Sequence, residues 1–397
     1  MKGKDRLDHL LENFVQAGVP GCGLAVSYKG KIVYTGYRGL ANIEEGRGVD
    51  EHTIYRIASC TKNITATAVM TLYEEGRLLL NDPVSDYLPC FKDIPYQMLD
   101  ASGEIIVKPT SRPLTIRDLL TMTSGIPYMG KGSLTGDDYA ENIGSMFSMY
   151  RLTLQELAQK VSQVPLDFDP GSHWRYGLSY DILAAVAEAV TGMRYSDFLK
   201  QRIFEPLGME NTTFCCTNGM FRDLAGVYCL KDGKQVNIGR EPNITESNGN
   251  KLESGGGGLL STLGDLVKFA GMWGQGGVWE GKRILSRNTI DLMRKNHLKG
   301  GALEDFRRMS ENAYPWYQGY GWGLAGRTLI DCQDAGSNGS PGEFGWCGAY
   351  GPYILADPGR QLGVAYTQQM APVIGGMQDY CHPRVRNVVY SLLDEWD

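Results

Sequence analysis

β-rich runs at both ends of the chain, with a mostly helical stretch between them, constrain its fold most strongly. Residues 23–28 and 32–37 are β-rich and are joined by a glycine turn, which is typical of a hairpin. The last third is β-rich again in short runs, at residues 329–330, 349–350, 353–356 and 362–366. We therefore predict an α/β protein in which an antiparallel sheet, flanked by helices, is built from both chain ends.

The spacing of apolar residues predicts where the helices lie. It favours helices over residues 7–15, 61–73, 152–161, 180–190, 196–204 and 384–393. From this distribution we predict an α/β body made of residues 1–92 and 246–397. Residues 93–245 would form a mostly helical insertion, with the active site between the two parts.

Composition narrows the classes of partner and compartment. The 397 residues carry a net charge of −6 without a basic stripe, which argues against nucleic acid or an anionic membrane as the main partner. No signal-peptide core or membrane span is visible. Nine scattered cysteines fit reduced thiols and lack metal-ligand spacing. We expect a cytoplasmic protein that acts on a small molecule without a metal or cofactor, and no feature sets its oligomeric state.

Ser59 and Lys62 are the first candidate catalytic pair. Ser59 is the only serine with a lysine three residues later, and in a helix these positions share one face. A helix start also leaves the backbone N–H of Ser59 free and favours negative charge there. Ser59 and Lys62 therefore suit a nucleophile and its base. The alternative, that Ser59 only caps the helix and Lys62 is solvated, stays open at this point.

The neighbouring sequence favours a lysine base. Ile57, Ala58 and Ile64 are apolar or small, so Lys62 would be partly desolvated and its pKa lowered. No G-x-S-x-G elbow is present. The five histidines, at positions 9, 52, 173, 297 and 382, have no sequence context of a Ser-His-Asp site.

Five further stretches carry a family resemblance. They are residues 55–62 (YRIASCTK), 80–84 (LNDPV), 114–125 (LTIRDLLTMTSG), 206–209 (PLGM) and 255–259 (GGGGL), the last leading to Ser261 and Asp265. Together they resemble the class C type of the serine β-lactamase and penicillin-binding-protein superfamily, and within it the family VIII carboxylesterases and the related statin side-chain acyltransferase. The resemblance implies a β-lactamase/transpeptidase-like fold.

The resemblance also implies a second catalytic residue, Tyr176. Most relatives have an asparagine where this chain has Leu178, whereas family VIII esterases resemble this chain there and at Asp181. A phenol beside an ammonium favours its phenolate form, so Tyr176 is expected to relay protons. Plain core packing is the alternative for Tyr176, and plain packing or helix capping is the alternative for Asp181 and for Tyr128, which are both expected to line the pocket.

Residues 346–349 (WCGA) resemble the third catalytic motif of the family. Relatives that act on β-lactams or D-alanyl peptides have a lysine or histidine where Trp346 stands, so the indole implies neutral acyl substrates. Trp346 would offer an apolar wall and an N–H donor, and Gly348 would let the substrate approach closely. By the family pattern, the N–H groups of Ala349 and Ser59 form the oxyanion hole. Met122 replaces a histidine found in many relatives.

These residues predict a serine hydrolase, a carboxylesterase that cleaves small neutral esters through a Ser59 acyl-enzyme. Weak β-lactam hydrolysis is left open beside that activity. An amidase, D-aminopeptidase or β-lactamase would use the same residues, and an acyltransferase would differ only in the acceptor. A catalytically silent penicillin-binding-like sensor is the alternative that is not an enzyme.

Overall fold

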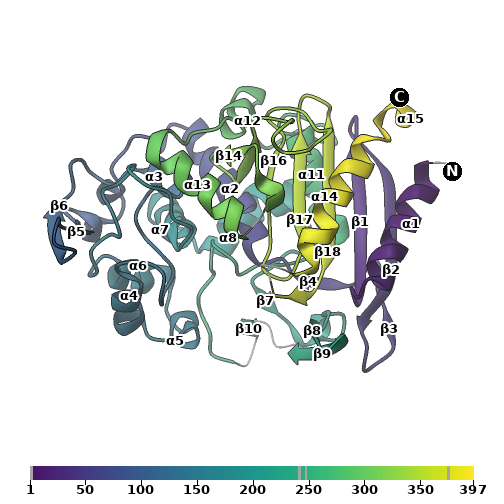
Figure 1. The fold of residues 1–397 in the computed structure, drawn as a ribbon, viewed down its shortest axis with the longest axis horizontal. Coiled ribbons are helices and arrows are strands. Elements are labelled where there is room, and N and C mark those ends of the chain that lie inside the picture. The colour runs from purple at the N-terminus through teal and green to yellow at the C-terminus, as the bar shows by residue number, and fades with distance from the viewer. Residues whose placement is uncertain (1–2, 240–242, 246–247, 314, 373–375) are drawn as a thin grey trace.

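An antiparallel sheet forms the centre of the molecule (Figure 1). The computed structural model describes residues 3–239, 243–245, 248–313, 315–372 and 376–397. Within them the sheet has eight strands in the order β14-β15-β16-β17-β18-β1-β2-β3. Their bounds are β14 Tyr320–Trp322, β15 Arg327–Leu329, β16 Phe344–Cys347, β17 Tyr353–Asp357, β18 Leu362–Gln368, β1 Gly21–Tyr28, β2 Lys31–Asn42 and β3 Arg47–Gly48.

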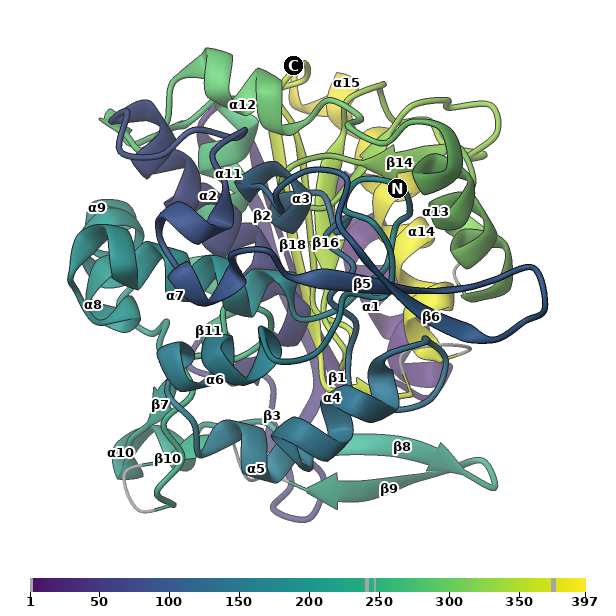
Figure 2. The same ribbon diagram turned by 90° about the vertical axis from the view of Figure 1, so that its left-hand side faces the viewer.

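The two chain ends meet where β1 pairs with β18. Leu24 lies opposite Tyr366 and Ala25 opposite Ala365, so alternate residues of both strands face opposite sides of the sheet. Leu24 and Tyr366 belong to the core under α1 (Gly3–Gln16) and α14 (Met377–Tyr390). Ala25 and Ala365 belong to the core under α11 (Leu263–Gly274). The predicted fold class, a sheet built from both ends and flanked by helices, is confirmed (Figures 1 and 2).

The middle of the chain supplies most of the remaining helices, which lie beside the sheet (Figure 1). They are α3 Ile116–Leu120, α4 Gly136–Ile143, α5 Met146–Tyr150, α6 Leu154–Val161, α7 Ser179–Thr191 and α8 Tyr195–Leu199, which continues as a π-helical turn, Lys200–Phe204. Two further helices, from outside the middle region, are α2 Thr61–Glu74 and α13 Gly300–Ala313. The boundaries of the predicted insertion stay a prediction.

Two hairpins in the middle region were not predicted from the sequence. They are β5 Pro95–Leu99 with β6 Ile105–Pro109, and β8 Val227–Lys231 with β9 Lys234–Gly239. The second hairpin carried a readable signal, because Asp232 and Gly233 form the turn with positive φ values of 51° and 74°.

Two local predictions near the C-terminus are wrong. Residues 349–350 are not a strand, since β16 ends at Cys347 and they lie in the turn that follows. The last long helix begins at Met377 rather than near residue 384, so Pro383 lies inside it. Cys381 and His382 before the proline and Val385 after it are buried, and this packing outweighs the lost backbone hydrogen bond.

Candidate active site

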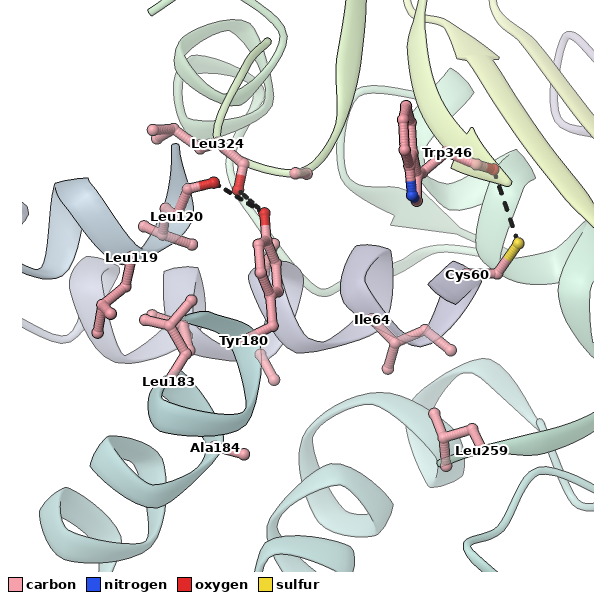
Figure 3. Close-up of a cluster of buried hydrophobic side chains, with 14 of the residues drawn as sticks. Cys60, Ile64, Leu119, Leu120, Tyr180, Leu183, Ala184, Leu259, Leu324 and Trp346 are labelled. Carbon is pink, nitrogen blue, oxygen red and sulfur yellow. Dashed lines mark hydrogen bonds between the residues drawn. The ribbon is translucent and has the colours of Figure 1, made fainter. Parts of the chain in front are cut away.

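Ser59 lies in a short 3-10 turn, Ala58–Cys60, that leads into α2. The chain bends sharply there, because Ala58 has a positive φ of 44°. The turn is held from two sides: Ile57 donates its N–H to Leu259 O at 3.1 Å, and the Cys60 thiol contacts Trp346 O at 3.6 Å (Figure 3). The Ser59 side chain caps neither the turn nor α2, so the capping interpretation is wrong.

Lys62 is fully buried and lies 3.2 Å from Ser59 Oγ through its Nζ atom. Nζ also donates to Gly256 O at 2.6 Å and to the Tyr128 hydroxyl at 3.1 Å. A neutral amine has two N–H donors and one lone pair, so these two acceptors leave the lone pair facing Ser59. Burial lowers the pKa of Lys62 to about 8, which favours this neutral form, and the solvated alternative is wrong.

Tyr176, from the segment that precedes α7, completes the cluster. It hydrogen-bonds with Ser59, and its ring centroid lies 4.6 Å from Lys62 Nζ. Burial raises the pKa of Tyr176 well above its ordinary value, although Ser59 and Trp346 oppose the rise by hydrogen bonding. The pKa therefore shifts in the direction opposite to the expected phenolate, because desolvation is its largest cause, and a phenol with a raised pKa can donate a proton.

Trp346 supports Tyr176 instead of facing a substrate with its N–H group. The indole Nε1–H donates to the Tyr176 hydroxyl at 2.7 Å, and Trp346 is only 3% exposed. Its ring stacks on Tyr317 with centroids 5.5 Å apart and packs against Trp322 at 4.7 Å. The expectation of a free N–H donor for the substrate is thus wrong, because a closer protein acceptor takes it.

Ala349 lies in the turn directly after β16, and it lines the same cavity as Ser59. Within the described ranges, the backbone N–H groups of Ser59 and Ala349 have no hydrogen-bond partner. Both are therefore free to receive an oxyanion. Gly348 has a structural role: a Cβ there would lie 2.2 Å from Ile57 O, so the glycine lets this turn approach the Ser59 segment, and its contact with substrate stays a prediction.

His382 holds the far side of the same turn. Its Nε2 lies 2.8 Å from Gly351 O, and since a carbonyl only accepts, Nε2 carries the proton. The ring is fully buried and stacks on Tyr353 at 4.6 Å. Burial lowers the pKa of His382 to about 3, so the ring stays neutral. Sequence reasoning left this residue without a role because α14 lies far along the chain.

Asp181 lines the Ser59 cavity and contacts the segment that holds Lys62. It is 1% exposed, at the start of α7, and borders the floor of the Ser59 cavity. Its Oδ1 accepts from the Ser254 hydroxyl at 2.5 Å and from Gly256 N at 3.2 Å. It thereby positions the Gly256 carbonyl that binds Lys62, and a direct contact of Asp181 with a substrate stays a prediction. The glycine run at 255–258 was the signal for this close approach.

Helix α7 is itself anchored by Tyr180, the residue before Asp181. The Tyr180 hydroxyl lies 2.9 Å from Leu120 O and 3.0 Å from Leu324 O, between α3 and the segment after β14 (Figure 3). Because all three segments are buried, the position of Asp181 is set by the core and not by a flexible loop.

Two cavities adjoin the cluster. The first, of about 680 Å³, contains Ser59 and Ala349, with Tyr128, Leu178, Gly256 and Tyr350 among its walls. The second, of about 920 Å³, is lined by Tyr176 and Trp174 on one side and by β5 and α13 on the other. Tyr176 therefore borders the second cavity, while Ser59, which Tyr176 contacts, opens into the first.

The described part of the chain contains no cluster of three or more histidine, cysteine, aspartate or glutamate side chains that could hold a metal ion. No helix among those residues is long and apolar enough to cross a membrane. None of the nine cysteines, which all lie within the described residues, forms a disulfide bond.

Fold and site together define a serine hydrolase of the β-lactamase/transpeptidase-like type. The chain belongs to the beta-lactamase family, whose model matches residues 7–375. Esterase EstB of Burkholderia gladioli is 28% identical over 407 residues, covering 97% of this chain and 95% of that protein.

Solved structures agree with this placement. EstCE1, described as a hydrolase with promiscuous acyltransferase activity, superimposes with a TM-score of 0.79 and 25% identity, and 98% of each chain is covered. Simvastatin synthase (LovD) of Aspergillus terreus has a TM-score of 0.81 at 21% identity, again over 98% of each chain, which shows the shared fold.

Proposed function

We propose that this protein is a carboxylesterase, similar to the family VIII enzymes, that cleaves small neutral esters through an acyl-enzyme on Ser59. The observation that carries the proposal is the arrangement of Lys62, Ser59 and Tyr176, with a neutral indole at the place of a cation. Among the described residues that line the cavity, Arg151 is the only basic one, and it is an exposed residue. The cavity wall therefore offers no buried cation that could pair with a carboxylate next to the scissile bond.

In the first half of the reaction, Lys62 takes the proton of Ser59, and Oγ attacks the ester carbonyl. The N–H groups of Ser59 and Ala349 stabilise the oxyanion, each contributing about 2.7–4 kcal/mol to the transition state. The carbon–oxygen bond to the alcohol then breaks, and the leaving oxygen takes a proton from Tyr176, which is reprotonated from Lys62.

In the second half, water attacks the acyl-enzyme and loses its proton through Tyr176 and Lys62. The bond between the carbonyl carbon and Oγ breaks, Ser59 regains its proton, and the carboxylic acid leaves. The acyl group stays attached to Ser59 between the two halves, while the alcohol is free to depart.

Acyl transfer to an alcohol is the second candidate, supported by the description of EstCE1. An alcohol that replaces water in the second half would give a new ester by the same steps. Adding a primary alcohol to the assay would then divert product from acid to ester, whereas a pure hydrolase would keep releasing acid.

The test is a substitution of the nucleophile. We expect Ser59→Ala to abolish turnover of p-nitrophenyl esters and covalent labelling by a fluorophosphonate, while Ser111→Ala, at an exposed serine, changes neither. Labelling that persists on another residue would contradict the assignment. Faster hydrolysis of nitrocefin or a D-alanyl anilide than of short esters would favour the β-lactamase or peptidase alternative. Absence of an acyl-enzyme mass shift with every activated ester would favour the silent sensor.

A further inference from the structure

The cavity around Ser59 has an apolar wall on one side of its mouth. Helix α5 contributes Met146, Phe147 and Met149 to this wall. Phe147 is 82% exposed and Met146 is 47% exposed, although both border the cavity that contains Ser59. Exposed apolar side chains at the rim of a groove are typical of a ligand-binding surface.

The wall is held firmly in place. Tyr150, the last residue of α5, accepts backbone hydrogen bonds on its carbonyl from Lys251 N at 2.7 Å and Leu252 N at 3.1 Å. Met149 is buried at 2% exposure and anchors the helix from below. Because residues 251–252 run into the glycine segment that binds Lys62, the apolar wall is tied to the catalytic cluster.

Three asparagines beside α5 form a polar part of the mouth, and each engages an amide N–H within the protein. Asn243 donates to the Tyr150 hydroxyl at 2.8 Å. Asn248 and Asn250 both donate to the Asn243 carbonyl, at 3.0 and 2.6 Å. These hydrogen bonds hold the asparagines to one another and to α5, while the exposed side chains of Phe147 and Met146 offer apolar surface that a ligand can cover.

The proton donor decides which part of an ester meets this wall. The leaving alcohol must lie next to Tyr176, and Tyr176 borders the second cavity and not the one under α5. The acyl group, bound to Ser59 and with its oxyanion at Ala349, then extends into the cavity that both of those residues line.

We infer that α5 is the acyl-binding wall and that the enzyme prefers esters of medium-length apolar carboxylic acids over acetate. The inference rests on the proposed esterase function and names its substrate class. A chain of several methylene groups would cover Phe147 and Met146 and remove their surface from water, whereas an acetyl group is too short to reach them.

The experiment varies the acyl and alcohol parts separately. One series is p-nitrophenyl esters from acetate to laurate, and the other is acetate esters of increasingly bulky alcohols. The variants are Phe147→Ala, Phe147→Leu and, as a control at an exposed apolar residue of β2, Ile32→Ala. Fluorophosphonate labelling of Ser59 is measured for every variant.

For the wild type we expect kcat/KM to rise from acetate to a maximum near hexanoate or octanoate. Phe147→Ala should lower kcat/KM for octanoate about tenfold and for acetate less than twofold, because only the longer chain contacts the ring. Phe147→Leu should keep most of the preference, and Ile32→Ala all of it.

An equal loss for acetate and octanoate, or a loss that follows the alcohol series, would overturn the assignment of α5 to the acyl group. A flat wild-type chain-length profile would overturn it as well. These outcomes differ from failure of the proposed function, in which wild-type Ser59 would not be labelled and no ester in either series would be turned over.

Discussion

The indole N–H of Trp346 donates to the hydroxyl of Tyr176 at 2.7 Å, deep beside the nucleophile. The acceptor is the same phenol that hydrogen-bonds with Ser59. A neutral donor thus stands where relatives that act on β-lactams carry a cation, and it acts on the catalytic tyrosine. Hydrogen bonding from Trp346 lowers the pKa of Tyr176 against the rise that burial causes, which makes the phenol a better proton donor.

Removing this donor should slow reactions that need a proton on the leaving group. Trp346→Phe keeps an aromatic ring against Tyr317 but leaves the Tyr176 hydroxyl without its donor. We expect kcat for alkyl esters to fall about tenfold, a loss of about 1.4 kcal/mol. p-Nitrophenyl esters should be less affected, since their leaving group departs as an anion. Trp279→Phe is the matched control, and an equal loss for both ester types would contradict this role.

The pH dependence of acylation should report Lys62. The base must be neutral to accept the Ser59 proton, and its pKa is about 8. The rate therefore rises with pH, and kcat/KM should show an ascending limb with an apparent pKa near 8 in the free enzyme. Initial rates with an uncharged ester between pH 6 and 10 measure it. A limb near pH 6, or a rate independent of pH across this range, would exclude Lys62 as the base.

Asp181→Asn should move that limb in a defined direction. The Asp181 charge favours the protonated form of Lys62 and so raises its pKa, in opposition to burial. The asparagine oxygen can still accept from Ser254 and Gly256 N, so the loop is kept. We expect the ascending limb to shift to lower pH. A shift to higher pH would show that Asp181 does not act on Lys62 through its charge. So would an unchanged limb in a variant whose thermal stability is intact.

His382 should act on the oxyanion hole as a positioning residue. It donates to Gly351 O in the turn that carries Ala349. His382→Leu removes the donor and should lower kcat about tenfold with little change in KM, because substrate binding precedes formation of the oxyanion. His382→Gln retains an N–H donor and should recover most of kcat. The melting temperature is expected to fall in both variants, since both lose the stack on Tyr353; equal losses of kcat would contradict the positioning role.

The active-site residues nearest to the nucleophile were predictable because their signals are local. Ser59 and Lys62 are one helical turn apart, and the apolar residues around them imply a buried lysine. Tyr176 and Ala349 followed only from the family resemblance. Helix α5 and His382 carried no motif, since a short amphipathic helix and a buried histidine look alike wherever they occur in a sequence.

The sequence by itself determined the sheet built from both ends, the helices that flank it, and the Ser59–Lys62 pair, since hydrophobic periodicity and short-range spacing are properties of neighbouring residues. Only the tertiary structure decided how those groups are used. The pKa of Tyr176 is raised because surrounding segments desolvate it, the Trp346 N–H is directed to Tyr176, and Gly348 meets Ile57 O. Each of these depends on contacts between residues more than a hundred positions apart, where burial and competition for hydrogen-bond partners outweigh local preference.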